Sequence, residues 1–179
     1  MKKSLPNASP NVLSERLREL EQAGVVKRDK LPPPASAHVY ELTDWGHELE
    51  ETVISLGRWA TRSPSLPSEA PIGADSVILA LKARLGANAA KELRANYELR
   101  LGEDRFHIAA SDRTVEVARG VSPDPDATID ADPGTLFSVL TNGRSLADAQ
   151  RSGTLSIDGD TAAVQRLVDL SKQPQPVGA

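Results

Sequence analysis

The sequence contains no cysteine and few aromatic residues: its 179 residues include two Phe, two Tyr, two Trp and a single Met. The absence of cysteine excludes disulfides and thiolate metal sites, and it is compatible with a reducing compartment. No apolar run approaches the length of a membrane span, and none follows the lysines at the start of the chain. We therefore expect a cytoplasmic protein with neither a signal peptide nor a membrane anchor.

Positive charge is also in short supply, since the net charge is −4. Its distribution is uneven, however. Residues 1–30 hold seven Lys and Arg against four Asp and Glu, whereas residues 31–62 hold two against five and residues 63–179 hold twelve against sixteen. The basic excess is therefore confined to the first segment, which is the only one whose charge favours contact with phosphates.

This first segment predicts an amphipathic helix. Ser9 is suited to cap the helix, Pro10 to occupy its first position and Gly24 to end it. Its apolar face consists of leucines at spacings of four and three, Leu13, Leu17 and Leu20.

A basic hairpin follows the helix, with strands predicted over residues 25–30 and 38–42 and a proline-rich turn between them. A helix followed by such a hairpin is typical of the recognition helix and wing of a winged helix-turn-helix, which bind the major groove and the DNA backbone. Polar side chains suited to bases or phosphates are Asn11, Ser14, Arg16, Arg18, Lys27, Arg28 and Lys30. The alternative is a helix whose polar side only faces water, and Arg16, beside the apolar face, is equally suited to a bond within the protein.

Two runs carry a resemblance to a known family, NVLSERLRELEQAGVVKR and VYELTDWGHELEETVISLGRWA. They resemble the second half of an HxlR-type winged-helix transcriptional regulator, over about the first third of the chain. The resemblance implies double-stranded DNA as a partner and a homodimer as the assembly. Helices that precede the recognition helix in that family have no counterpart before Met1, which leaves open that this segment has lost DNA binding and only dimerises.

The second of these runs predicts a helix that begins after Thr43, with Asp44 in its first turn. Its apolar side is too extensive for a helix surrounded by water. The resemblance implies a role in the dimer interface, and packing on the protein's own second domain is the alternative. The residues expected in this interface are Trp45, Leu49, Val53, Leu56 and Trp59.

A proline- and serine-rich segment divides the chain, and it predicts a linker over residues 63–74. We expect a winged helix-turn-helix over residues 1–62, a second domain over residues 75–171 and a disordered tail over residues 172–179.

The second domain predicts an α+β fold. Three alternating runs, residues 97–101, 105–109 and 114–118, are separated by short turns and predict an antiparallel meander. Further strands are expected over residues 127–131 and 154–158, with helices before, between and after them. The sheet should therefore be mainly antiparallel, with about five strands.

This domain resembles the sterol carrier protein fold over roughly residues 75–170. The matching runs are LFSVLTNG and SLADAQRSGTLSIDGDTAAVQRLVDL, in which Gly153 and Gly159-Asp160 mark turns. The resemblance implies a cavity between sheet and helices for a fatty acyl chain, a sterol or another apolar ligand. A filled core without a ligand is the alternative. The residues expected to converge there are Val77, Leu81, Leu99, Phe106, Ile108, Val117, Phe137 and Leu140.

Neither catalysis nor a metal site is predicted. His38 and His47 have no third ligand at metal spacing, and the glycines form no phosphate-binding loop. A cluster of carboxylates lies in a Pro-rich loop and on an outward strand face, positions that favour solvated turn residues. These carboxylates are Asp124, Asp126, Asp130 and Asp132. We expect no enzyme activity and no cofactor.

Two functions are consistent with both resemblances. The first is a dimeric winged-helix regulator that uses an apolar small molecule as its effector. The second is a lipid-binding or carrier module whose N-terminal segment serves only for dimerisation. The first interpretation is favoured because it gives both the basic hairpin and the second domain a role.

Overall fold

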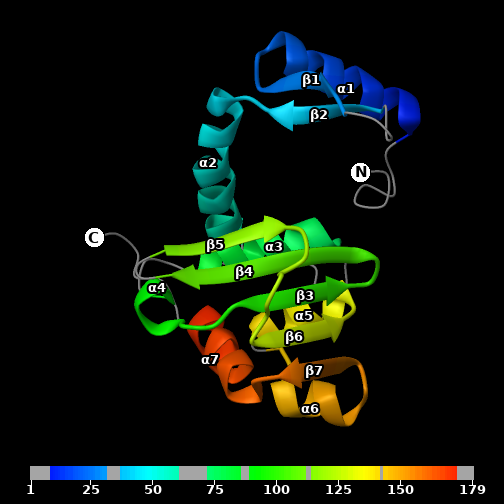
Figure 1. Cartoon of the computed structure of the whole chain (residues 1–179). Helices are drawn as coiled ribbons and strands as arrows, with labels where there is room; N and C mark the ends of the chain where they lie inside the picture. The colour runs from blue at the N-terminus through cyan, green and yellow to red at the C-terminus, as the bar shows by residue number, and fades with distance from the viewer. Residues whose placement is uncertain are drawn as a thin grey trace. The chain divides into compact units, whose positions relative to one another are not determined.

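The computed structural model describes residues 9–31, 37–60, 72–85, 89–111, 114–141 and 143–172. The chain divides into two compact units, Met1–Leu56 and Gly57–Ala179 (Figure 1). Most of the predicted turn over residues 32–37, of the linker over residues 63–74 and of the tail over residues 172–179 lies outside the described residues. The predicted domain boundaries therefore remain predictions.

The N-terminal unit consists of a helix, a two-stranded antiparallel hairpin and the start of a second helix, in the predicted order. The elements are α1 (Pro10–Gln22), β1 (Val26–Lys30), β2 (His38–Leu42) and α2 (Asp44–Ala60). The Ser9 hydroxyl accepts a hydrogen bond from the backbone N–H of Val12 at 3.3 Å, as expected of a helix cap. Gly24 has a φ of +74°, a conformation that glycine adopts readily, and it turns the chain from α1 into β1.

Thr43 joins these elements at one corner. Its hydroxyl donates to the carbonyl oxygen of Gly24 at 2.6 Å and accepts from the N–H of Gly46 at 3.0 Å, while its own N–H donates to Val25 at 3.1 Å. Gly46 is buried, and a Cβ atom there would lie 2.0 Å from the Val25 carbonyl oxygen. The first turn of α2 is therefore fixed against the end of α1 and the start of β1.

The N-terminal unit has very little core of its own. Among its described residues, Val25 and Val26 are the only buried apolar side chains. Leu13 and Leu17 on α1 are half-buried, and Leu20 is exposed. Because apolar burial is the main stabilising contribution in small domains, this small core contributes little to the stability of the unit.

The C-terminal unit contains a five-stranded sheet in the order β5-β4-β3-β6-β7. Its strands are β3 (Tyr97–Leu101), β4 (Asp104–Ser111), β5 (Thr114–Arg119), β6 (Ala127–Ala131) and β7 (Leu155–Gly159). Its helices are α3 (Ala74–Arg84), α4 (Ala89–Glu92), α5 (Pro133–Leu140), α6 (Leu146–Arg151) and α7 (Thr161–Lys172). The predicted α+β fold and five-stranded sheet are confirmed.

The strand pairing adds one feature to the prediction. β3, β4 and β5 form the expected antiparallel meander, but β6 pairs with β3 in parallel, with Ile129 opposite Leu99. The chain between β5 and β6 has to pass over β4 and β3 to reach its place, and Figure 1 shows it in front of these strands. Hairpin turn signals in a sequence reveal pairing between successive strands only, so the parallel pair was not predicted.

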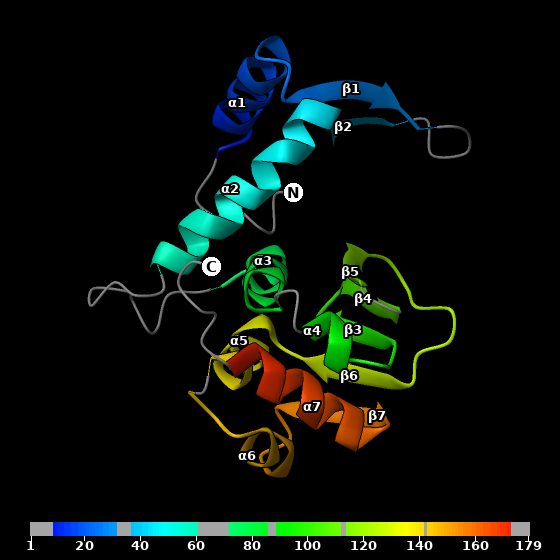
Figure 2. The same cartoon turned by 90° about the vertical axis from the view of Figure 1, so that its left-hand side faces the viewer.

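The helices α3, α5 and α7 contact one another and lie on one face of the sheet (Figure 2). In every strand, alternate side chains point towards these helices. Paired residues of adjacent strands, such as Leu99 and Phe106, lie on the same face, so these side chains together form one core. Tyr97, fully buried, donates its hydroxyl hydrogen bond to the carbonyl oxygen of Ala163 at 3.1 Å and so ties β3 to α7. Burial raises the pKa of this phenol to about 12, so it stays a donor at neutral pH.

The Gly159-Asp160 turn has the structural role predicted for it. Gly159 has a φ of +97°, and a Cβ atom there would lie 2.3 Å from the carbonyl oxygen of Asp126. The N–H of Asp160 donates to that same oxygen at 2.9 Å, and its carboxylate accepts from the N–H of Ala163 at 2.9 Å, capping α7. The motif therefore joins the beginning of β6, the end of β7 and the beginning of α7.

The contact between Gly46 and Val25 generates a first prediction, which uses the fact that both tryptophans of the chain lie on α2. Gly46→Ala should lower the midpoint of denaturation followed by tryptophan fluorescence, because the added methyl group requires the corner to open. Gly57→Ala is the matched control: nothing lies within 4 Å of its Cβ position, so alanine should be neutral or stabilise the helix by up to about 1 kcal/mol. Equal midpoints for the two variants would contradict the tight corner.

Candidate nucleic-acid interface and apolar core

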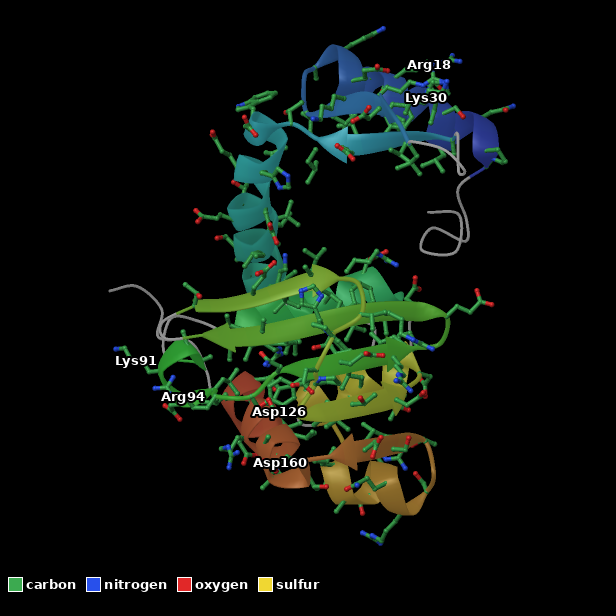
Figure 3. The ribbon with its side chains drawn as sticks, viewed as in Figure 1. Arg18, Lys30, Lys91, Arg94, Asp126 and Asp160 are labelled. Carbon is green, nitrogen blue, oxygen red and sulfur yellow. The ribbon has the colours of Figure 1, made fainter. Side chains whose placement is uncertain are left out.

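One face of α1 carries the predicted base-contacting residues. Asn11, Ser14 and Arg18 are spaced by three and four residues, so they share a face, and all three are exposed. The Ser14 hydroxyl donates to the Pro10 carbonyl oxygen at 2.8 Å, so in this conformation it can only accept a hydrogen bond from another group. Figure 3 shows the Arg18 side chain extending away from the ribbon. This face can meet the edges of bases in a groove.

Arg16 lies on a different side of α1. Its guanidinium donates to the Glu19 carboxylate at 2.5 Å, and this hydrogen bond raises the pKa of Arg16. Both side chains are exposed, so the pair adds little stability. The geometry matches the alternative of a bond within the protein, and a DNA contact by Arg16 remains a prediction.

The hairpin separates the predicted basic residues into two sides. Side chains alternate along a strand, so Arg28 and Lys30 share a side and Lys27 points to the other. Lys27 lies opposite Glu41, with 3.8 Å between its Nζ atom and the carboxylate. Arg28 and Lys30 are therefore the stronger phosphate candidates. The side that they form is called the cationic side of the wing.

His38 also belongs to the cationic side, although sequence reasoning treated it as an ordinary surface residue. The register places it directly opposite Lys30, and Tyr40 directly opposite Arg28. His38 is exposed, whereas Tyr40 is half-buried. The signal was present in the sequence, since two antiparallel strands joined by a turn fix which residues face each other, but it required the turn length to be known.

The apolar face of α2 remains open in the structure. The exposed fractions are 57% for Trp45, 41% for Leu49, 46% for Val53, 60% for Leu56 and 65% for Trp59. Several large apolar side chains that are this exposed and lie on one helix face mark an interaction surface. The stripe defined by these five residues is called the α2 stripe; what covers it remains a prediction.

The predicted ligand-binding residues come together in the C-terminal unit. Seven of the eight are buried in one core cluster, and Phe137 packs against it while partly exposed. The seven are Val77, Leu81, Leu99, Phe106, Ile108, Val117 and Leu140. Sequence reasoning missed Tyr97, a fully buried member of the same cluster, although the alternation of the strand places it on the same face as Leu99. Whether a ligand enters this core stays a prediction.

The outer face of the sheet, on the opposite side from the helices, is polar. Glu98 is only 3% exposed, and its carboxylate accepts from the Arg100 Nε at 2.8 Å with the Arg105 Nε at 3.9 Å. His107 pairs with Glu98 across the strands, and its Nδ1 atom is buried without a hydrogen-bond partner. Glu98, Arg100, Arg105 and His107 therefore lie on the face of the sheet opposite the helix-covered core.

Two of the predicted turn carboxylates have structural roles, which corrects the expectation that all four are only solvated. The Asp126 carboxylate accepts from the N–H of Asn96 at 2.7 Å (labelled in Figure 3). Asp132 caps α5 by accepting from the Thr135 N–H at 2.9 Å and from the Thr135 hydroxyl at 2.5 Å. Burial alone would raise the pKa of Asp132, but these hydrogen bonds outweigh it and lower the pKa.

No group of three or more His, Asp or Glu able to hold a metal ion occurs among the residues that the structure describes. No helix in this part of the chain is long and apolar enough to cross a membrane.

Two protein-family models match the chain. The model of the HxlR-like helix-turn-helix family matches residues 1–66, and the model of the SCP-2 sterol transfer family matches residues 77–172, which is more than half of the chain. The two matches together contain every residue assigned above to the interface and to the apolar core.

Curated relatives match the N-terminal unit. The uncharacterized HTH-type transcriptional regulator YvaP of Bacillus subtilis (strain 168) is 50% identical over 58 residues, 32% of this chain and 54% of YvaP. The HTH-type transcriptional regulator YodB of the same organism is 37% identical over 57 residues, 32% of this chain and 51% of YodB. The chain thus spans about half the length of the curated relatives that it matches.

A solved structure resembles the fold. The stereoselective inverting sec-alkylsulfatase Pisa1 from Pseudomonas sp. aligns with a TM-score of 0.52 at 11% identity, covering 98% of this chain and 32% of the sulfatase. At this identity the likeness shows a shared fold and nothing about a reaction. The chain belongs to the SCP-2 sterol transfer family through residues 77–172 and carries an HxlR-like helix-turn-helix domain in residues 1–66.

Proposed function

We propose that the chain is a cytoplasmic, homodimeric, DNA-binding transcriptional regulator whose C-terminal domain binds an apolar small molecule as its effector. The observation that carries this proposal is the exposed polar face of α1 beside the cationic side of the wing, in a unit whose relatives are HTH-type transcriptional regulators. The basic excess of residues 1–30, in a chain of net charge −4, serves a purpose if this segment meets phosphate.

The DNA contacts divide into two kinds. Asn11 has the amide that pairs with adenine, and Arg18 the guanidinium that pairs with guanine or a phosphate, so α1 reads sequence in the major groove. Arg28 and Lys30 contact backbone phosphates, which positions the protein without reading bases. This division follows from which face of α1 and which side of the hairpin each residue occupies.

The spacing of the α2 stripe supports dimerisation through it. Trp45, Leu49, Val53, Leu56 and Trp59 recur at intervals of four and three residues, the period at which two helices pack along a common seam. A second copy of α2 offers the same stripe, so each helix covers the other. Because Thr43 and Gly46 fix α2 against α1 and β1, pairing the α2 helices would also set the separation of the two α1 helices.

The chemistry of the C-terminal core supports an uncharged, apolar ligand or the hydrocarbon part of a lipid. Its side chains are aliphatic, aromatic or alanine, and the buried charged side chain of the unit's described residues, Glu98, lies on the outer face of the sheet. Fatty acids, fatty acyl esters and sterols have this chemistry. We propose binding rather than catalysis, because Asp126 and Asp132 of the carboxylate cluster are occupied in turns and caps.

A prediction for DNA concerns the cationic side of the wing. Arg28→Ala combined with Lys30→Ala should weaken binding to every duplex and reduce the slope of log affinity against log salt by about 0.9 per lost phosphate contact. Lys27→Ala, on the other side of the hairpin, is the control and should change both quantities less. Asn11→Ala should alter sequence preference instead. Absence of any duplex affinity at low salt, in a folded dimer, would rule the regulator out and favour the lipid-carrier alternative.

A prediction for assembly concerns the α2 stripe. Leu56→Glu should weaken the dimer by about a hundredfold to ten-thousandfold, since each of the two protomers loses a buried leucine side chain that contributes about 1.5–3 kcal/mol. Leu79→Glu places the same charge at an exposed leucine of α3, outside the stripe, and should leave the sedimentation coefficient unchanged. Sedimentation of the unmodified chain as a monomer at micromolar concentration would show that α2 has a different partner.

A prediction for the core uses palmitate, an acyl-CoA ester and cholesterol as probes, with calorimetric melting of the full chain. A probe that binds only the folded state should stabilise it by about 2.7 kcal/mol at a hundred times its Kd. Phe137→Ala should reduce that stabilisation, whereas Leu79→Ala, outside the core cluster, should not. If none of the three probes shifts the melting temperature, the effector proposal fails.

A further inference from the structure

We propose that His38 is a proton-dependent phosphate contact of the wing, so that affinity for DNA rises as the pH falls. The inference rests on the DNA binding proposed above and adds a residue and a regulation to it. It starts from the pairing of Lys30 with His38 and of Arg28 with Tyr40 in the hairpin. The cationic side of the wing therefore carries the side chains of Arg28, Lys30 and His38.

No carboxylate lies on that side of the hairpin within the described strands. Alternation puts Lys27 and Asp29 of β1, and Glu41 of β2, on the opposite side. The Asp29 carboxylate accepts from the backbone N–H of Lys30 at 2.7 Å, and Glu41 faces Lys27. The charged groups that share a side with His38 are therefore Lys30, directly opposite, and Arg28, diagonally placed.

Charged groups on neighbouring helices complete the surroundings. The helix α1 packs against β1, and its exposed charged residues are Glu15, Arg16, Arg18, Glu19 and Glu21, of which Arg16 and Glu19 bond to each other. The helix α2 begins two residues after β2 ends, at the opposite end of that strand from His38. The two carboxylates of the hairpin, Asp29 and Glu41, interact with Lys30 and Lys27 and lie on the other side of the hairpin, so the exposed imidazole of His38 belongs to a cationic surface.

A phosphate is the group that suits this position. Imidazole gains a proton between about pH 5 and 8, and the charged form donates from both ring nitrogens. With Arg28 and Lys30 on the phosphate backbone, the imidazole of His38 lies next to the same anionic strand, and a nearby anion favours the protonated form. Binding DNA then takes up a proton at His38. Affinity consequently increases as the pH falls, and it levels off once His38 is charged in the free protein.

The test uses fluorescence anisotropy with a labelled mixed-sequence duplex, because a phosphate contact requires no particular operator. Binding by the full chain is measured at about pH 5.5 and pH 8, each at several salt concentrations. The unmodified chain should bind about three- to tenfold more tightly at the lower pH, and its salt slope should steepen by about 0.9 for each His38 engaged.

Three variants separate the explanations. His38→Gln should remove the pH effect, and His38→Arg should bind tightly at both pH values. His47→Gln, at an exposed histidine in the first turn of α2 and at the opposite end of β2 from His38, should behave like the unmodified chain. A pH effect that persists unchanged in His38→Gln would overturn the inference while leaving DNA binding intact. Absence of duplex binding at both pH values would instead overturn the proposed function, and the inference with it.

Discussion

The hydrogen bonds of Thr43 are the constraint on which the N-terminal unit depends. One hydroxyl group joins the end of α1, the start of β1 and the first turn of α2, and Gly46 allows the backbones to approach because it lacks a side chain. Without this corner, three short elements with two buried valines would have little to hold their relative orientation. A surface on α1 and a surface on the wing can act together only if the angle between them is fixed.

The two units differ in how they obtain stability. The C-terminal unit has a continuous core between sheet and helices, and its turns are fixed by glycines and caps such as Gly159 and Asp160. Arg119 of β5 donates to Asp75 of α3 at 2.5 Å and to Asp104 of β4 at 2.6 Å, and its guanidinium lies 4.6 Å from the centre of the Phe106 ring. The N-terminal unit instead has two buried valines, and Leu20 of α1 and most of the α2 stripe are exposed.

Local sequence chemistry predicted most of the elements. Ser9, Pro10 and Gly24 define α1 because capping, a missing N–H and a positive φ each act within a few residues. The strand alternation in residues 97–118 likewise predicted the meander. The parallel pairing of β6 with β3 was not predictable in this way, because it depends on a connection that crosses two strands.

In the candidate sites too, features set by neighbouring residues were predicted, whereas features set by the pairing of distant residues were not. The polar face of α1 that is proposed to read bases could be predicted, since helical spacing alone places Asn11, Ser14 and Arg18 together. The separation of Lys27 from Arg28 and Lys30, and the inclusion of His38, needed the hairpin register. In the core, composition identified the apolar residues but not that Tyr97 is buried with them, because its hydroxyl finds the Ala163 carbonyl only in three dimensions.

The central claim is that an apolar ligand in the C-terminal domain controls DNA binding by the N-terminal unit. The most direct measurement is the affinity of the full chain for duplex DNA with and without a saturating fatty acid or sterol that has been shown to bind. Coupling between two sites amounts to about 1–3 kcal/mol in regulated proteins, so the account predicts a change in Kd of about five- to 150-fold. Reciprocity requires DNA to change the affinity for the ligand by the same factor. Identical DNA affinities in the presence and absence of a bound ligand would contradict the account.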